Sequence, residues 1–427
     1  MVVPIPFDAV LFDLDGTLLA TDRYWVPAAR VGARRAFLEL GLTRDLPTAA
    51  EWMALVGLPL DEGFAELFAD LEPAARELVQ RRCVEEEHFA LKAGQAALLP
   101  GVRDVLEELR ELGVPMGVAS NCSQSYLDAA LVDMGLNEFI AEGRCLDSRG
   151  IRGKADMISD LLLTFGTRSA VMVGDRRGDC QAAHANALPH VHLANGFAPG
   201  GEAVPAEAEI EDFLELLPRL RGRARMIEGA LEELGVGAGP RRSLGITGRS
   251  GCGKSLLARD AVASLVSRGH DAVLVRLDDF LRPEEERRGY AELAASEHLS
   301  RAFDVEVLCE EVLEPLGRGR RVAHCRFGAE GQKIEITLAP GSILVLEGLF
   351  LLHPRLRSQL GAVLYLDLDS EACLHRVAAR ELPLGGQEEI ERTRRYFLPA
   401  QEAFDELFDP ASGADLLLSA ENPLGPG

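Results

Sequence analysis

Positive charge is scarce in this sequence. Its 45 lysines and arginines face 68 aspartates and glutamates, so the formal net charge is −23 at pH 7. A general nucleic-acid-binding surface and an anionic-membrane-binding surface both need concentrated positive charge. The sequence also lacks an apolar stretch long enough to cross a bilayer, and residues 1–7, with two prolines, lack the pattern of a secretory signal. We therefore expect neither a nucleic-acid nor a membrane partner.

Cysteine pairs with metal-binding or disulfide spacing are missing as well. The eight cysteines are scattered at positions 83, 122, 145, 180, 252, 309, 325 and 373, and no two of them form a C-x-x-C motif. In a chain of 427 residues this distribution fits reduced thiols better than a disulfide or zinc framework. The cysteine pattern thus predicts a cytoplasmic protein.

Strand-like apolar runs alternate with helical segments throughout the sequence. This alternation predicts an α/β architecture with parallel sheets, and the length allows two or three domains. A stretch rich in arginine and glycine marks the expected boundary, so we predict a first domain over 1–222, a linker over 223–240 and a second domain over 241–427. Residues from about 20 to 95 carry helical patterns only, and we predict that they form a helical insertion.

The most specific motif begins at residue 248, where the sequence reads Gly-Arg-Ser-Gly-Cys-Gly-Lys-Ser. It lies between a strand-like and a helical segment, the context that a phosphate-binding loop requires. Backbone N–H groups of such a loop surround phosphate oxygens, and Lys254 is expected to reach the β- and γ-phosphates while the Ser255 hydroxyl binds Mg²⁺. The motif predicts a site for a nucleoside triphosphate, ATP or GTP, formed by Gly248, Arg249, Ser250, Gly251, Cys252, Gly253, Lys254 and Ser255.

Four short motifs lie in order along the first half of the chain, at the ends of strand-like segments. They supply Asp13 and Asp15 before a Gly-Thr turn, then Ser120, then Lys154, and finally the pair Asp175 and Asp179. Together they resemble the haloacid dehalogenase superfamily of phosphatases, in particular members of the phosphoglycolate-phosphatase type. The resemblance implies a Rossmann-like core, and the helical insertion matches the cap that this family carries after its first motif.

The same resemblance implies a role for each of these residues. Asp13 would be the nucleophile that takes the phosphoryl group, and Asp15 the general acid and base. Ser120 would hydrogen-bond the phosphoryl group and Lys154 would neutralise charge around it. The expected Mg²⁺ ligands are Asp13, Asp15, Asp175 and Asp179. Because a cap closes over small substrates, a small phosphomonoester is favoured.

Further acidic and basic motifs follow the phosphate-binding loop. A strand-like segment ends in Asp278 and Asp279, a second contains Glu347, and a basic helical segment carries Arg376 and Arg380. With a closing Y-x-x-x-x-P…A-D pattern, this order is similar to the uridine kinase / phosphoribulokinase family over about residues 241–420. The expected fold of this half is therefore a parallel α/β kinase domain of the P-loop NTPase type.

This second resemblance implies phosphoryl transfer to a hydroxyl group. Asp278 occupies the place of the base that accepts the substrate proton, and Glu347 that of the acid that acts on Mg²⁺ directly or through water. Arg376 and Arg380 match the lid, where guanidinium groups stabilise charge on the transferring phosphate.

The sequence departs from uridine kinases where those enzymes recognise the base. Leu281 replaces an aromatic residue, residues 297–301 replace an F-D-H-P-D motif, and the segment that embraces the base is reduced to Cys-Arg-Phe at 325–327 followed by Gly-Ala-Glu-Gly. Uridine and cytidine are therefore doubtful acceptors. A sugar, a polyol or a modified nucleoside is at least as plausible, with Arg326 as a contact to an anionic group.

The leading hypothesis is a bifunctional enzyme in which a capped, Mg²⁺-dependent phosphatase for small phosphomonoesters is fused to an ATP-dependent kinase for a small hydroxyl acceptor. Polynucleotide end repair also joins these two chemistries, but the cap and the net charge weigh against it. A third hypothesis makes one half a sensor that binds phosphate ligands and regulates the other half. The sequence leaves both substrates and the oligomeric state open.

Overall fold

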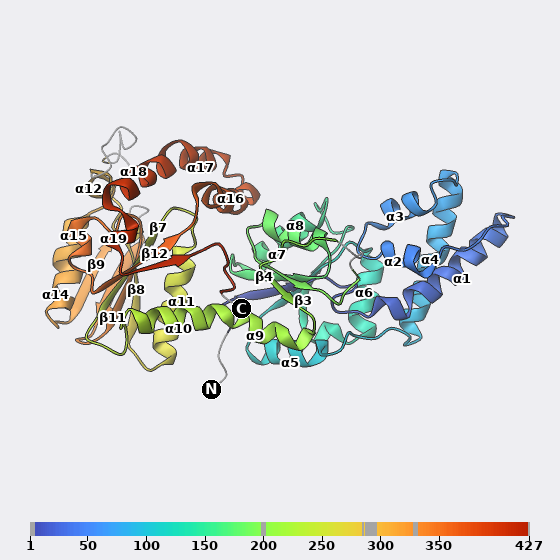
Figure 1. The fold of residues 1–427 in the computed structure, drawn as a ribbon, viewed down its shortest axis with the longest axis horizontal. Coiled ribbons are helices and arrows are strands. Elements are labelled where there is room, and N and C mark those ends of the chain that lie inside the picture. The colour runs from blue at the N-terminus through green and yellow to red at the C-terminus, as the bar shows by residue number, and fades with distance from the viewer. Residues whose placement is uncertain (1–4, 198–201, 284–285, 287–296, 328–331, 426–427) are drawn as a thin grey trace. The chain divides into compact units, whose positions relative to one another are not determined.

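The computed structural model describes residues 5–197, 202–283, 286, 297–327 and 332–425 (Figure 1). The chain divides between Arg221 and Gly222 into two compact units. Each unit is built on a sheet of parallel strands with helices around it, so the predicted α/β class is confirmed for both. Among the described residues, no helix combines the length and the apolar composition that a membrane span needs.

The first unit contains a six-stranded sheet in the order β3-β2-β1-β4-β5-β6. Its strands are β1 (Ala9–Phe12), β2 (Met116–Ala119), β3 (Ile140–Arg144), β4 (Ala170–Gly174), β5 (His190–Leu193) and β6 (Ala208–Ile210). The longer helices after the insertion are α5 (Val102–Glu111), α6 (Gln124–Asp133), α7 (Lys154–Phe165), α8 (Arg177–Ala185) and α9 (Leu216–Leu220). All residues of the central strands β1, β2 and β4 are buried, as expected when helices cover both faces of a parallel sheet.

The helical segment of the first unit comprises a 3-10 turn (Thr21–Arg23) and four helices, drawn in blue in Figure 1. These are α1 (Trp25–Glu39), α2 (Ala49–Ala54), α3 (Leu60–Leu67) and α4 (Pro73–Lys92). Their core is aromatic, with ring centroids 5.8–6.1 Å apart among Trp25, Phe37, Trp52, Phe64 and Phe68. A Cβ at Gly32 would lie 2.5 Å from the backbone of Cys83, so glycine is what allows α1 and α4 to approach this closely.

The second unit contains a five-stranded parallel sheet in the order β13-β12-β7-β11-β8 and a separate antiparallel pair, β9 and β10. The parallel strands are β7 (Ser243–Gly248), β8 (Ala272–Arg276), β11 (Ile343–Glu347), β12 (Ala362–Asp367) and β13 (Leu416–Ser419); the antiparallel ones are β9 (Val322–Phe327) and β10 (Lys333–Leu338). Its helices of ten or more residues are α10 (Gly222–Glu233), α11 (Lys254–Ser267), α16 (Ser370–Glu381) and α18 (Leu398–Phe408). Shorter helical segments are α12 (His298–Ala302), α13 (Val305–Val307), α14 (Glu314–Gly317), α15 (Pro354–Arg357), α17 (Gln387–Arg392) and α19 (Pro410–Gly413).

Helix α10 lies within the segment expected as a linker, yet it packs into the core of the second unit. Ile227 and Leu231 are buried in the same apolar cluster as residues of α11 and of the central strands. A buried ion pair adds to this contact, with 2.6 Å between Nη2 of Arg223 on α10 and Oδ2 of Asp260 on α11. Separating such a pair would leave a charge without its partner in an apolar environment, so α10 is firmly attached to α11.

Candidate active sites

Three buried carboxylates gather at the carboxyl edge of the first sheet. Asp13 directly follows β1, Asp175 directly follows β4, and Asp179 lies in the first turn of α8. Strands β1 and β4 are neighbours, with Phe12 opposite Val173, which brings together motifs that are some 160 residues apart in sequence. Oxygen atoms of all three carboxylates lie within 4.8 Å of one another.

Lys154, the first residue of α7, is the cation that faces this cluster. Its Nζ lies 2.7 Å from Oδ1 of Asp13 and 2.5 Å from Oδ1 of Asp179. Burial lowers the pKa of Lys154, but the charges of Asp13 and Asp179 outweigh it and raise the pKa above its usual value, so the amine stays protonated. The other Asp13 oxygen, Oδ2, is buried and has no hydrogen-bond partner in the part of the chain described. The ammonium of Lys154 does not balance the charge of three carboxylates, and Asp13 Oδ2 has no partner among the described residues. Such a group of oxygen atoms fits a divalent cation such as Mg²⁺.

Asp15 is two residues from Asp13, but its side chain belongs to a different group of contacts. Its Oδ1 accepts hydrogen bonds from Thr21 Oγ1 and Tyr126 Oη, each at 2.6 Å, and a longer one from Tyr24. Burial raises the pKa of Asp15, although these hydrogen bonds oppose it. The structure therefore does not bring Asp15 into the carboxylate cluster where a metal-ligand role had been predicted, and it gives this acid the raised pKa that suits a proton donor.

A pocket of about 530 Å³, counting the open space at its mouth, lies over Asp15 and Ser120. Ser120 follows β2 and is almost fully buried, so it lies at the same sheet edge as the carboxylates. The side chain of the adjacent Asn121 donates a 3.1 Å hydrogen bond to the carbonyl of Gly57 and so ties this edge to the segment between α2 and α3. Residues of α1 and α4 complete the walls, so the pocket is enclosed partly by the helical segment.

The pocket contains functional candidates that sequence reasoning missed, above all Glu87 on α4. Glu87 shares the buried side of this helix with Val79, Cys83, Ala90 and Leu91. In the sequence, Glu87 is the one charged residue among apolar residues that recur every three to four positions, the spacing of one buried helix face. Recognition of that spacing would have marked Glu87 as a buried carboxyl, although not as a neighbour of Asp15.

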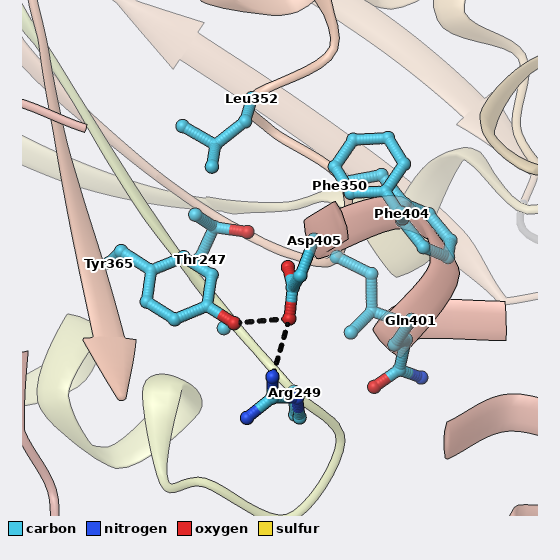
Figure 2. A pocket seen from close by; sticks show the side chains of 10 residues that line it. Thr247, Arg249, Phe350, Leu352, Tyr365, Gln401, Phe404 and Asp405 are labelled. Atoms are coloured by element: carbon cyan, nitrogen blue, oxygen red, sulfur yellow. Dashed lines mark hydrogen bonds and ion pairs between the residues drawn. The ribbon is translucent and has the colours of Figure 1, made fainter. Parts of the chain in front are cut away.

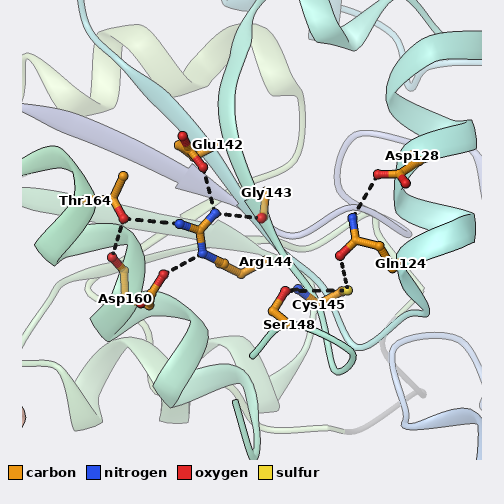
Figure 3. Close-up of polar contacts among 9 residues, drawn as sticks. All are labelled: Gln124, Asp128, Glu142, Gly143, Arg144, Cys145, Ser148, Asp160 and Thr164. Carbon is orange, nitrogen blue, oxygen red and sulfur yellow. Dashed lines mark hydrogen bonds and ion pairs between the residues drawn. The ribbon is translucent and has the colours of Figure 1, made fainter. Parts of the chain in front are cut away.

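A polar network around Arg144 and Cys145 holds the loop that follows β3 (Figure 3). Arg144, at the end of β3, contacts Glu142 and the Asp160 side chain on α7, and its carbonyl accepts a 3.1 Å hydrogen bond from the backbone N–H of Ser120. The backbone N–H of Cys145 donates to Ser148 Oγ at 3.0 Å. These contacts connect β2, β3 and α7, and so fix Ser120 and the start of the Lys154 motif relative to each other.

The phosphate-binding loop of the second unit connects β7 to α11, as its motif requires. Gly248 and Gly251 have φ angles of 147° and 90°, and a Cβ on either would lie 2.4 Å from a carbonyl oxygen, that of Leu366 or Cys373. The loop therefore needs glycine at both positions, which lets its backbone take the curved path of a phosphate-binding loop. These residues fit a nucleoside triphosphate.

Two predicted Mg²⁺ contacts meet beside this loop. Ser255 Oγ donates a 3.2 Å hydrogen bond to Oε2 of Glu347, the last residue of β11. Burial raises the pKa of Glu347; the ammonium of Lys254 opposes this shift and the carboxylate of Asp278 reinforces it. Lys254, Asp278 and Ser255 therefore all act on the carboxyl group of Glu347. Lys254 itself lies with Nζ 3.4 Å from the carbonyl of Arg249.

The two lid arginines have different surroundings. Arg376 on α16 donates hydrogen bonds to the carbonyls of Cys252 at 2.9 Å and Ala420 at 2.8 Å, which places it against the phosphate-binding loop. Arg380, one turn later, is half exposed and contacts the neighbouring Glu381 at 2.6 Å. The structure thus places Arg376 against the phosphate-binding loop and Arg380 beside Glu381.

The other side of the loop is held by α18, a contact that the sequence did not predict. Arg249 Nη2 lies 3.1 Å from Asp405 Oδ2, which also accepts a 2.6 Å hydrogen bond from Tyr365 (Figure 2). The backbone N–H of Ser250 donates to Gln401 Oε1 at 2.7 Å. Arg249, Tyr365, Gln401 and Asp405 line a second pocket of about 240 Å³.

Arg326, suggested as a contact to an anionic group, lies on β9 with its guanidinium 4.9 Å above the ring of Phe280. Its Nε and Nη1 are buried and have no hydrogen-bond partner among the described residues. Leu281 pairs with Phe303 and residues 298–301 lie in α12, whereas the Gly-Ala-Glu-Gly segment at 328–331 lies outside the described residues.

Comparisons with known proteins match the two parts of the chain to different families. Residues 10–191 match the model described as haloacid dehalogenase-like hydrolase, and residues 243–419 match that of the phosphoribulokinase / uridine kinase family. A phosphoglycolate phosphatase of Pseudomonas putida is 30% identical over 223 residues, which cover 49% of this chain and 78% of that protein.

Solved structures resemble the two parts separately. One, of a predicted phosphoglycolate phosphatase from Haemophilus somnus, covers 50% of this chain and 97% of its own, with 21% identity and a TM-score of 0.45. Another, of a candidate fructose transport system kinase from a Silicibacter species, covers 46% of this chain and 98% of its own, with 24% identity and a TM-score of 0.38.

Proposed function

Residues 10–191 belong to the haloacid dehalogenase-like hydrolase family and residues 243–419 to the phosphoribulokinase / uridine kinase family, and from this premise we propose that the chain is a bifunctional enzyme. Its first activity is the Mg²⁺-dependent hydrolysis of small phosphomonoesters. Its second is the transfer of a phosphoryl group from ATP to a small hydroxyl acceptor. The observation that carries the proposal is the pairing of Lys154 with Asp13 and Asp179 at the sheet edge that also carries the pocket-lining Asp15 and Ser120.

The phosphatase reaction divides between two carboxyls in different environments. Asp13 attacks phosphorus, and the ammonium of Lys154 offsets the charge that accumulates on the nucleophile and the phosphoryl oxygens. Asp15, whose pKa burial raises, gives its proton to the leaving oxygen and later accepts one from water. A bound Mg²⁺ would supply further positive charge, held by Asp13, Asp175 and Asp179.

The kinase reaction uses residues at the carboxyl edge of the second sheet. The phosphate-binding loop holds the triphosphate, Lys254 and Arg376 balance its charge, and Ser255 with Glu347 would hold Mg²⁺. Asp278, exposed just beyond β8, accepts the proton of the acceptor hydroxyl. If both activities acted on the same hydroxyl of one compound, their only net effect would be to consume ATP. We therefore propose that the two activities act on different positions of a compound or on successive steps of one pathway.

Two assays on the purified chain test this proposal. We expect hydrolysis of 4-nitrophenyl phosphate that is lost with a chelator, and ATP consumption that equals the phosphorylated product formed from one member of a panel of sugars, polyols, nucleosides and hydroxy acids. Strong, salt-sensitive binding to DNA ends, with DNA ends preferred over every small ester, would instead support polynucleotide end repair and contradict the proposal.

The affinity of the phosphatase site for Mg²⁺ is expected to increase as the pH rises from about 6 to 8. Burial and the nearby charge of Asp179 raise the pKa of Asp175 to about 7, and this carboxyl must lose its proton before it can bind a cation. Below that pKa, each pH unit should strengthen binding by up to about tenfold. Calorimetry without nucleotide, in two buffers of different ionisation enthalpy, will measure the proton released. An affinity that does not change with pH would contradict this prediction.

A further inference from the structure

The pocket of the first unit is acidic and contains no cation. Of its described lining residues, Asp15 and Glu87 are the carboxylic acids, and none is lysine, arginine or histidine. The residues of this unit that the structure does not describe, 1–4 and 198–201, include no lysine or arginine either. A substrate that carries a carboxylate next to its phosphate group would therefore add a third acid to a pocket whose described lining offers no cation.

Two cations lie beside this pocket, but both are engaged. Lys154 is buried between Asp13 and Asp179. Arg176 donates a hydrogen bond to the carbonyl of Val56, which lines the pocket, and its Nε lies 3.3 Å from Glu202. Neither is free to bind a carboxylate in the part of the substrate that leaves, because each would first have to give up its present partners.

Glu87 lines the same pocket, and its side chain forms no hydrogen bond with any described residue. It is only 7% exposed, and no donor among the described residues reaches its carboxyl group. Burial raises the pKa of Glu87 well above its usual value, and the charge of Asp15, a second acid, raises it further. A buried carboxyl without a hydrogen bond is unfavourable, so a group that supplies one on binding gains both affinity and orientation. A hydroxyl can form a hydrogen bond with this carboxyl in either protonation state, whereas a carboxylate can do so only while the carboxyl keeps its proton.

We propose that the phosphatase site takes phosphomonoesters whose leaving alcohol is uncharged and carries a further hydroxyl, and that Glu87 selects this alcohol by accepting a hydrogen bond from the hydroxyl. The proposal rests on the phosphatase function proposed above. The Pseudomonas putida relative is named for phosphoglycolate, an ester whose leaving alcohol carries a carboxylate. The proposal therefore gives this chain a different preferred substrate.

The direct test uses the unmodified full-length chain and substrates matched in size. Glycerol 3-phosphate and 3-phosphoglycerate differ by a hydroxymethyl group against a carboxylate, as do 2-hydroxyethyl phosphate and 2-phosphoglycolate; O-phosphoethanolamine offers an ammonium group instead. We expect kcat/KM for each hydroxyl ester to exceed that of its carboxylate partner by at least about tenfold. Equal or better hydrolysis of the carboxylate esters would overturn the proposal, and so would a tenfold preference for the ammonium ester.

Variants assign the preference to Glu87. Glu87→Gln keeps the shape of the side chain and removes its ability to ionise, so the ratio of kcat/KM between hydroxyl and carboxylate esters should fall severalfold. Glu87→Leu removes the acceptor and should bring the ratio close to one. Glu86→Gln, on the same helix but paired with Arg35 outside the pocket, should leave the ratio unchanged. An unchanged ratio in both Glu87 variants would overturn the role of Glu87.

Hydrolysis of 4-nitrophenyl phosphate separates failure of this proposal from failure of the proposed function. If this ester is hydrolysed while the carboxylate esters are preferred, the phosphatase function stands and the selection by Glu87 is wrong. If no phosphomonoester is hydrolysed at all, the phosphatase function is wrong and the substrate proposal falls with it.

Discussion

Replacement of Asp13 by asparagine is expected to lower phosphatase activity by at least about 10³-fold and to leave kinase activity within about twofold of the original. Asparagine has almost the same shape but its amide cannot attack phosphorus, so the loss reflects chemistry and not packing. The measurement is kcat/KM for 4-nitrophenyl phosphate, with ATP-dependent phosphorylation followed in the same preparation.

The stability of this variant provides a control. Asp13 is one of three buried carboxylates around a single ammonium, and its removal leaves Lys154 paired with Asp179 at 2.5 Å. We therefore expect Asp13→Asn to unfold at the same temperature as the original chain or a higher one when no metal is present. Asp104→Asn, at an exposed position of α5, should change neither activity. Residual hydrolysis above about one tenth in Asp13→Asn would rule out Asp13 as the nucleophile.

Replacement of Lys254 by alanine is expected to lower kinase activity by about 10²- to 10³-fold and to leave hydrolysis of phosphomonoesters unchanged. Lys254 is the first residue of α11 and faces the loop that would hold the β- and γ-phosphates, so its ammonium offsets charge that grows during transfer. Alanine is the best helix former, and the start of α11 should be preserved. ATP binding measured by calorimetry should weaken together with kcat/KM.

Arg268→Ala is the matched control for Lys254→Ala. It removes one positive charge from the other end of α11, where Arg268 lies 3.7 Å from Glu232. Its kinase activity should stay within about twofold of the original, since surface ion pairs of this kind contribute little. Loss of both activities from either Asp13→Asn or Lys254→Ala would contradict two independent sites.

The motif residues were readable from the sequence because their chemistry depends on short spacings. Asp13 and Asp15, or Lys254 and Ser255, are positioned by one strand end or one helix start, and parallel strands bring their carboxyl ends to the same edge. The α/β class followed from alternating segments in the same way. Which of these residues perform catalysis stays a prediction until the variants above are measured.

Contacts between distant segments could not be read in this way. Asp15 was predicted to be one of the metal ligands, but its carboxyl is hydrogen-bonded to Thr21 and Tyr126, which come from the helical segment and from α6. The link from Arg249 to Asp405 spans more than 150 residues and follows no motif. Such pairs depend on how helices pack, and one sequence does not state which faces meet.

The sequence by itself determined the two families, the parallel α/β class and the order of the acidic and basic motifs, because these depend on local patterns of residue type. Only the tertiary structure decided that Lys154 is paired with Asp13 and Asp179, that Glu87 lies unpartnered in the same pocket as Asp15, and that α10 belongs to the second unit. The physical reason is burial. The pKa values and the charge of a pocket depend on which side chains lose water together, and that is settled when the chain packs.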